Sequence, residues 1–128
     1  MTWPAATWLA VTIAGAAGAA CRYVVDFVVT QRLRGAFPWG TWLVNISGAL
    51  LLGGIAGTAL AAPDAVWWEV AVGTGFCGAY TTFSTYMFET LQLVERRAWW
   101  DALWNLASLA AGVVAAVAGA AFGAALGR

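Results

Sequence analysis

The sequence predicts an all-α membrane protein with four transmembrane helices. The chain has 128 residues, of which 62% are hydrophobic and only 9% are charged. Soluble domains carry about 25% charged residues, so this composition excludes a water-soluble fold. The charges also cluster and leave four uncharged stretches, each close to or longer than the roughly 20 residues that cross a bilayer. These stretches are residues 1–21, 35–63, 70–88 and 102–127. Four spans nearly exhaust the chain, so a single domain is expected over residues 1–128.

The four helices are expected over residues 5–30, 38–61, 65–95 and 98–126. Pro38 suits the first turn of the second helix. Pro63 and Asp64 mark the turn before the third helix, and residues 95–97 mark the turn before the fourth. The nine tryptophans support these boundaries because they gather near the helix starts, and tryptophan prefers the membrane–water interface.

Glycines recur every four residues in two of the predicted helices. They are Gly53 and Gly57 in the second helix, and Gly119, Gly123 and Gly127 in the fourth. Such spacing lets helix backbones approach closely in lipid. The glycines are compatible with packing inside one protomer and equally with a subunit interface. If the protein conducts or transports something, an oligomer is expected, because four short helices do not easily enclose a water-lined path by themselves, and symmetric dimers are the commonest closed assembly.

The third span combines the length of a membrane helix with a composition that weakens one. Three glycines precede four hydroxyl side chains, and both groups disfavour a regular helix. The residues are Gly73, Gly75 and Gly78, then Thr81, Thr82, Ser84 and Thr85. We expect this helix to be broken in mid-membrane. Free backbone groups cannot face lipid, so a break there must be buried in protein or line a cavity. The segment is therefore a candidate ion or substrate site.

Enzyme chemistry is not expected. The chain has no histidine, which is the commonest metal ligand and general base. A G-x-G-x-x-G spacing occurs at residues 73–78, but it lies in an apolar span without the strand–turn–helix setting that gives this motif its meaning. Net charge is zero, and no basic patch suggests nucleic acid.

Neutral polar side chains remain at membrane depth. They are Asn45 and Ser47 in the second helix, Thr81, Thr82, Ser84, Thr85 and Tyr86 in the third, and Asn105 and Ser108 in the fourth. One interpretation is hydrogen bonding between helices. The other is the lining of a path: hydroxyls, an amide and ring edges supply positive character without full charge, which fits a small anion that must still be released. A broken helix also frees carbonyls, which are cation ligands.

The segment GFCGAYTTFSTY (75–86) resembles the signature of the Fluc, or CrcB, fluoride channels. Three further segments agree with that family in order and spacing: GAAGAACRY (15–23), PWGTWLVNISG (38–48) and ALWNLASLAAG (102–112). The resemblance implies a fluoride-selective channel in the inner (plasma) membrane that exports cytoplasmic fluoride passively. It also implies an antiparallel, dual-topology homodimer with two pores and one structural sodium ion at its centre.

The same resemblance assigns site residues. Phe83 matches the first pore phenylalanine, and Tyr86 stands in the position of the second. Asn45, Ser108 and Arg22 match a pore asparagine, a polar pore residue of the fourth helix and a vestibule arginine. Thr82 joins the candidate pore residues from the polar set above. The sodium ligands would be the backbone carbonyls of Gly78 and Thr81, one pair from each subunit.

Two alternatives stay open. The arginines crowd one predicted face (Arg22, Arg32, Arg34, Arg96 and Arg97), whereas the other face has only Arg128. That bias sets topology and by itself predicts one fixed orientation, which would require a partner chain of opposite bias. The alternative function is a small multidrug-type four-helix transporter, but that class is expected to carry a glutamate in its first helix, and this chain has none there.

Overall fold

The computed structural model describes residues 4–61 and 66–127, and over these residues it is helical and contains no strand. Within these residues, three helices are long and apolar enough to cross a membrane: α1 (Ala5–Arg32), α2 (Trp39–Ala61) and α6 (Trp99–Leu126). The protein is therefore a multi-pass membrane protein. The turn predicted at Pro63 and Asp64 lies outside the described residues.

The long helices begin and end within two residues of their predicted bounds. The one local difference is at Pro38, which directly precedes α2 instead of occupying its first turn. Its carbonyl accepts the N–H of Trp42 at 3.0 Å, so proline satisfies one of the free donors at the start of the helix.

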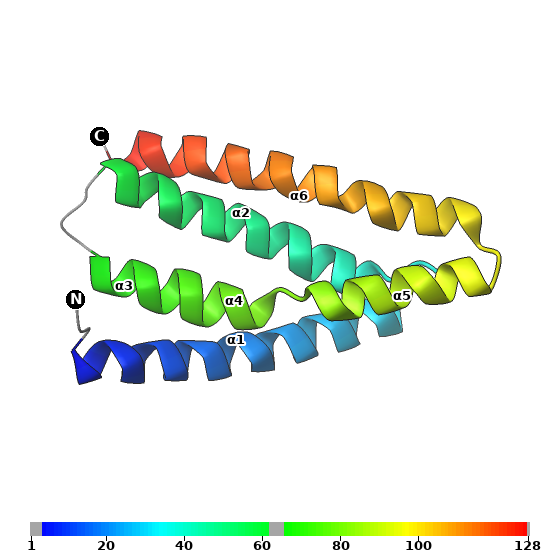
Figure 1. The fold of residues 1–128 in the computed structure, drawn as a ribbon, viewed down its shortest axis with the longest axis horizontal. Helices are drawn as coiled ribbons and strands as arrows, with labels where there is room; N and C mark the ends of the chain where they lie inside the picture. The colour runs from blue at the N-terminus through cyan, green and yellow to red at the C-terminus, as the bar shows by residue number, and fades with distance from the viewer. Residues whose placement is uncertain (1–3, 62–65, 128) are drawn as a thin grey trace.

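The third passage is not one continuous α-helix. It consists of α3 (Val66–Glu69), the π-helix η1 (Val70–Cys77), α4 (Gly78–Tyr80) and α5 (Phe83–Glu95). Between α4 and α5 the backbone is extended at Thr81 (φ −80°, ψ 158°) and Thr82 (φ −147°, ψ 125°). Figure 1 shows this link as a thin trace between two helical segments. A π-helix of eight residues is unusual, because π geometry mostly occurs as single turns.

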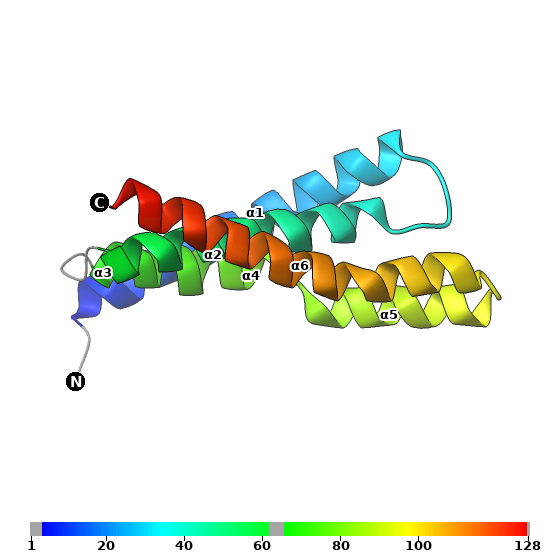
Figure 2. The ribbon, with the colours of Figure 1, turned by 90° about the horizontal axis from the view of Figure 1, so that it is seen from above.

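The chain crosses the bundle four times. In Figure 1, α6 lies beside α2, and the α3–α4 segment lies beside α1. The beginning of α1 and the end of α6 lie at one end of the bundle, and both views place the α1–α2 connection and the α5–α6 turn at the other (Figures 1 and 2). The arginines at 32, 34, 96 and 97 therefore share one end.

Glycines bring α2 and α6 into backbone contact. A Cβ built on Gly53 would overlap the carbonyl oxygen of Ala116, and one built on Gly119 would overlap that of Leu50. Gly57 and Gly123 are enclosed in the same way. The structure thus decides between the two uses left open by the sequence: these glycines pack two helices of one protomer.

A second close approach joins α1 to η1. A Cβ on Gly75 would lie 2.7 Å from the carbonyl oxygen of Val11, and one on Gly18 would overlap the backbone of Phe76. The middle glycine of the G-x-G-x-x-G spacing therefore serves helix packing here.

The α5–α6 turn is a Schellman motif. Ala98 donates its N–H to the carbonyl of Leu93 at 2.9 Å, and Arg97 donates to that of Val94 at 3.0 Å. This motif requires a left-handed residue after the helix, a position that glycine usually fills. Here it is Arg97, with φ 59°, the only non-glycine residue with positive φ in the described chain.

Replacing Arg97 by glycine is expected to stabilise the protein by about 0.5–1 kcal/mol. The left-handed conformation costs a residue with a side chain about 1–2 kcal/mol, and glycine removes this cost. Glycine also raises the conformational entropy of the unfolded chain, which lowers stability by about 0.4–1 kcal/mol and so offsets part of the gain. Chemical unfolding in micelles measures the difference. Arg96→Gly is the matched control, because it removes the same charge at a residue with ordinary φ (−78°) and should destabilise. Equal effects of the two variants would contradict the backbone explanation.

Candidate ion-binding site

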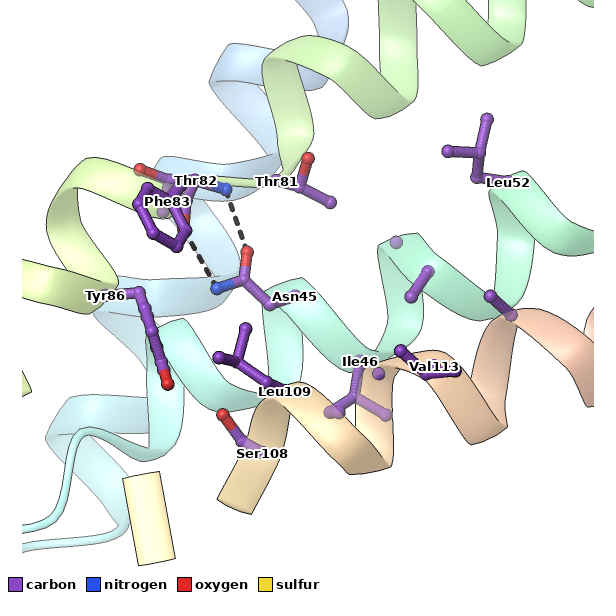
Figure 3. Close-up of a pocket in the computed structure, with 14 residues that line it drawn as sticks. Asn45, Ile46, Leu52, Thr81, Thr82, Phe83, Tyr86, Ser108, Leu109 and Val113 are labelled. Carbon is purple, nitrogen blue, oxygen red and sulfur yellow. Dashed lines mark hydrogen bonds between the residues drawn. The ribbon is translucent and has the colours of Figure 1, made fainter. Parts of the chain in front are cut away.

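One side chain of α2 holds the extended link between α4 and α5. The Nδ2 of Asn45 donates to the carbonyl oxygen of Thr82 at 2.9 Å, and the N–H of Thr82 donates to Oδ1 of Asn45 at 2.8 Å (Figure 3). The amide thus pairs with both backbone groups of one residue, as a neighbouring strand would. Interrupting a helix frees such groups, and inside a membrane each needs a partner.

The same link redirects two helical hydrogen bonds. In a continuous α-helix the N–H of Thr82 would bond to the carbonyl of Gly78, and the N–H of Thr85 to that of Thr81. Here the N–H of Thr82 donates to Oδ1 of Asn45, and the N–H of Thr85 donates to the hydroxyl of Thr82 at 3.4 Å. The carbonyl oxygens of Gly78 and Thr81 are therefore released from their usual partners.

A cavity of about 370 Å³ opens between α2, the link, α5 and α6 (Figure 3). Its walls are largely apolar, with a few polar groups gathered at one end. Five of the predicted pore residues line it together with Thr81: Asn45, Thr82, Phe83, Tyr86 and Ser108.

Two aromatic side chains of this cavity differ in exposure. Phe83 is 67% exposed, whereas Tyr86 is only 2% exposed and its hydroxyl donates to the carbonyl of Leu106 at 3.4 Å. Their ring centroids lie 5.9 Å apart. Within the protomer, Phe83 therefore offers its ring to whatever enters the cavity, and Tyr86 forms part of the wall toward α6.

Arg22 lies in a second cavity of about 200 Å³. Its lining is more polar and comes from α1, α2 and the link: Arg22, Tyr23, Asp26, Thr41, Val44, Thr82 and Thr85. Thr82 lines both cavities, so the clamped link lies between them. The structure does not bring Arg22 together with Phe83, and Gly78 belongs to neither lining.

Sequence reasoning missed a polar contact beside the second cavity. Thr41 is 2% exposed and donates to Oε1 of Glu89 at 3.0 Å. The other carboxylate oxygen of Glu89 is buried and has no hydrogen-bond partner among the described residues. The sequence did contain an indication that Thr41 belongs near the site, because Thr41 lies four residues before Asn45 and so shares its helix face.

Comparisons with known proteins agree with one another. The family model described as "CrcB-like protein, Camphor Resistance (CrcB)" matches residues 9–120. A protein of Streptomyces avermitilis named fluoride-specific ion channel FluC 1 is 46% identical over 107 residues, which is 83% of this chain and 86% of that protein. A Mycobacterium tuberculosis protein named fluoride-specific ion channel FluC 2 is 48% identical over 101 residues, 79% of this chain and 77% of the other.

A third relative, from Thermobifida fusca, is also named fluoride-specific ion channel FluC 1, and it is 46% identical over 108 residues. That alignment covers 84% of this chain and 87% of the relative. The four segments on which the resemblance was based all lie within the matched residues 9–120. Since the match spans most of the chain at this identity, the chain belongs to the CrcB family.

Proposed function

We propose that this protein is a fluoride-selective ion channel that exports cytoplasmic fluoride passively through the plasma (inner) membrane. One observation carries the proposal: polar and aromatic residues converge on a cavity beside an interrupted helix, in a chain 46–48% identical to proteins named fluoride-specific ion channels. An inside-negative potential drives an anion outward by about 2.3 kcal/mol per charge for 100 mV. No chemical step is needed, and the protein is not an enzyme.

The lining has the chemistry that a small, strongly hydrated anion requires. The hydroxyls of Thr82 and Ser108, which within the protomer donate to Oγ1 of Thr85 and to the carbonyl of Asn105, can turn to donate to an anion. The edge of the Phe83 ring carries partial positive charge. None of these groups holds an anion as tightly as a buried cation would, so the ion can enter and leave. Arg22, in the neighbouring cavity, attracts anions toward the link.

The structure also supports a structural sodium ion and a second copy of the chain. The freed carbonyls of Gly78 and Thr81 suit a sodium ion, as unwound helices do in other membrane proteins. Two carbonyls do not surround a cation, so a second copy would supply the other pair across a two-fold axis. Gly78 is exposed, and a Cβ on it would meet nothing within 4 Å in the described protomer, which leaves room for a partner.

We therefore propose an antiparallel, dual-topology homodimer with two pores and with the interruption at mid-membrane depth. Antiparallel pairing would place one arginine-rich end at each membrane face. The assembly is tested by accessibility of a C-terminal tag in sealed membrane vesicles. Half of the tags should be accessible from each side. A single orientation would overturn the homodimer in favour of a partner chain with opposite arginine bias.

Fluoride efflux from liposomes tests the function itself. Vesicles loaded with potassium fluoride and reconstituted with the protein should release fluoride once a potassium ionophore is added, and a fluoride electrode records the release. Matched vesicles loaded with potassium chloride should retain their anion. Equal release of both halides would overturn selectivity. Proton-driven uptake of an organic cation, without fluoride release, would favour the multidrug-type transporter.

The sodium ion is expected to stay in place during conduction. Carbonyls from two copies would enclose the cation at the two-fold axis, so we expect it to stay bound while anions pass along side chains that line the cavities. Vesicles loaded with fluoride and radioactive sodium should therefore lose fluoride and keep the tracer. Release of tracer at the rate of fluoride would contradict a structural role for sodium.

A further inference from the structure

A buried polar pair joins α5 to α6 behind the wall of the cavity of about 370 Å³ that Phe83 and Tyr86 line. This cavity is the larger of the two described above and is called the larger cavity below. Asn105 is 0% exposed, and Thr90 is 5% exposed. Neither belongs to the lining of the larger cavity or of the Arg22 cavity. Polar side chains enclosed in this way are costly unless they are hydrogen bonded, so their partners show what the pair holds together.

The partners lead to Tyr86. The Nδ2 of Asn105 donates to the hydroxyl of Thr90 at 2.8 Å, and this hydroxyl donates to the carbonyl oxygen of Tyr86 at 2.8 Å. The same nitrogen lies 3.5 Å from that carbonyl. Because the Tyr86 hydroxyl donates to Leu106, both ends of this residue are tied to one turn of α6.

The cavity wall depends on that turn. Ser108 lies three residues after Asn105 and donates its hydroxyl to the carbonyl of Asn105. Tyr86 supplies the α5 side of the lining at this level, and Ser108 supplies the α6 side. The separation of the two helices here therefore sets the separation of the two wall residues.

We propose that Asn105, through its hydrogen bond to Thr90, is a positioning residue of the anion path, which keeps Tyr86 and Ser108 at the separation that lets fluoride pass. The inference rests on the proposed function, and it assigns to Asn105 no contact with the ion. In this arrangement the amide acts from the layer behind the wall.

If Asn105 served only the stability of the fold, a different residue would suit this position. The Oδ1 of Asn105 is buried and has no hydrogen-bond partner in the part of the chain that the structure describes. An unpaired buried acceptor destabilises a fold, whereas an apolar residue of similar size carries no such penalty. Stability alone would therefore tolerate leucine at this position, and positioning would not.

The test compares Asn105→Leu, Thr90→Val and the double variant with wild type in the fluoride efflux assay. Protein is reconstituted at less than one channel per vesicle, so that the fraction of active vesicles and the rate per active channel are measured separately. Thr12→Val is the control, because among the described residues the Thr12 hydroxyl bonds to the carbonyl of Trp8, within its own helix, and to no other group.

We expect each single variant to lower the rate per channel on the order of tenfold, which corresponds to the loss of one good hydrogen bond. The double variant should be no slower than the single variants, since both remove the same contact, and the active fraction should not change. Thr12→Val should match wild type. If Asn105→Leu does not reconstitute, Thr90→Val decides, because it removes the hydroxyl to which the amide binds.

Two results would overturn the inference. One is a lower active fraction with an unchanged rate per channel, which is the signature of a stability role alone. The other is a multiplicative loss in the double variant, which would mean that the two residues act independently. Wild-type vesicles that release no fluoride would overturn the proposed function itself, and the two failures are thereby distinguishable.

Discussion

Replacing Phe83 by isoleucine is expected to abolish fluoride efflux while leaving the protein folded and assembled. The two side chains are similar in size and apolarity, so packing changes little. Isoleucine lacks the positive ring edge, which is the part of phenylalanine that can face a partly dehydrated anion. We expect the rate per channel to fall on the order of 100-fold or more. At about 1.4 kcal/mol for each tenfold step, this corresponds to a rise of about 2.8 kcal/mol or more in the barrier to conduction.

The chain offers a matched control for this experiment on the same helix. Phe88 is 61% exposed, close to the 67% of Phe83, but it does not line the larger cavity. Phe88→Ile removes an equally exposed ring at a position where only lipid or partner packing is at stake. It should conduct fluoride like wild type. Size-exclusion chromatography of both variants in detergent shows whether assembly is preserved.

The ring-edge assignment fails if the Phe83 variant conducts at the wild-type rate, or if Phe83→Ile and Phe88→Ile slow efflux equally. The second outcome would mean that the loss reflects general packing of α5. A Phe83→Ile variant that conducts chloride as well as fluoride would assign the ring to selectivity and not to conduction.

Most of the fold could be predicted because the bilayer constrains it so strongly. A helix that crosses about 30 Å of hydrocarbon needs an uncharged run of about 20 residues, and α1, α2 and α6 correspond to such runs. Proline and charged residues then leave little freedom for the turns. The small residues of α2 and α6 likewise predicted close packing, but not which surfaces meet, because glycine allows close approach to any neighbour.

The third passage shows where prediction from sequence stops. Glycine and threonine content indicated that a regular helix would be weak somewhere between residues 73 and 85. Composition does not locate the extended residues at Thr81 and Thr82, because a side chain from another helix decides this. Asn45 bonds to Thr82 across 37 residues of sequence, and its two hydrogen bonds replace those of the helix.

The candidate site shows the same division. Asn45, Thr82, Phe83, Tyr86 and Ser108 gather around one cavity, although they come from three separate segments. Their roles toward fluoride stay predictions until the experiments above are done. The burial of Tyr86 and the contact of Thr41 with Glu89 depend on how α5 packs against α6 and α2, and local sequence patterns carry no information on such packing.

The packing of α2 against α6 gives the second large expected effect. Gly53→Ala should destabilise the protein by at least about 3 kcal/mol, at the upper end of the cost of overpacking. The added methyl group would overlap the carbonyl oxygen of Ala116, which is backbone and cannot turn aside as a side chain would. The two helices must then separate, and their contact is the most extensive one between helices in the described residues.

Gly54→Ala is the control, and its effect should have the opposite sign. The nearest atom to a Cβ on Gly54 is the carbonyl oxygen of Gly119 at 3.8 Å, an ordinary van der Waals distance. In that space alanine should stabilise the helix by about 0.5–1 kcal/mol relative to glycine. Unfolding of both variants in mixed micelles gives the two free energies. If both alanine variants change the free energy of unfolding in the same direction, helix propensity and not contact with α6 explains the two glycines. Changes of opposite sign would establish that α2 and α6 meet through the face that contains Gly53.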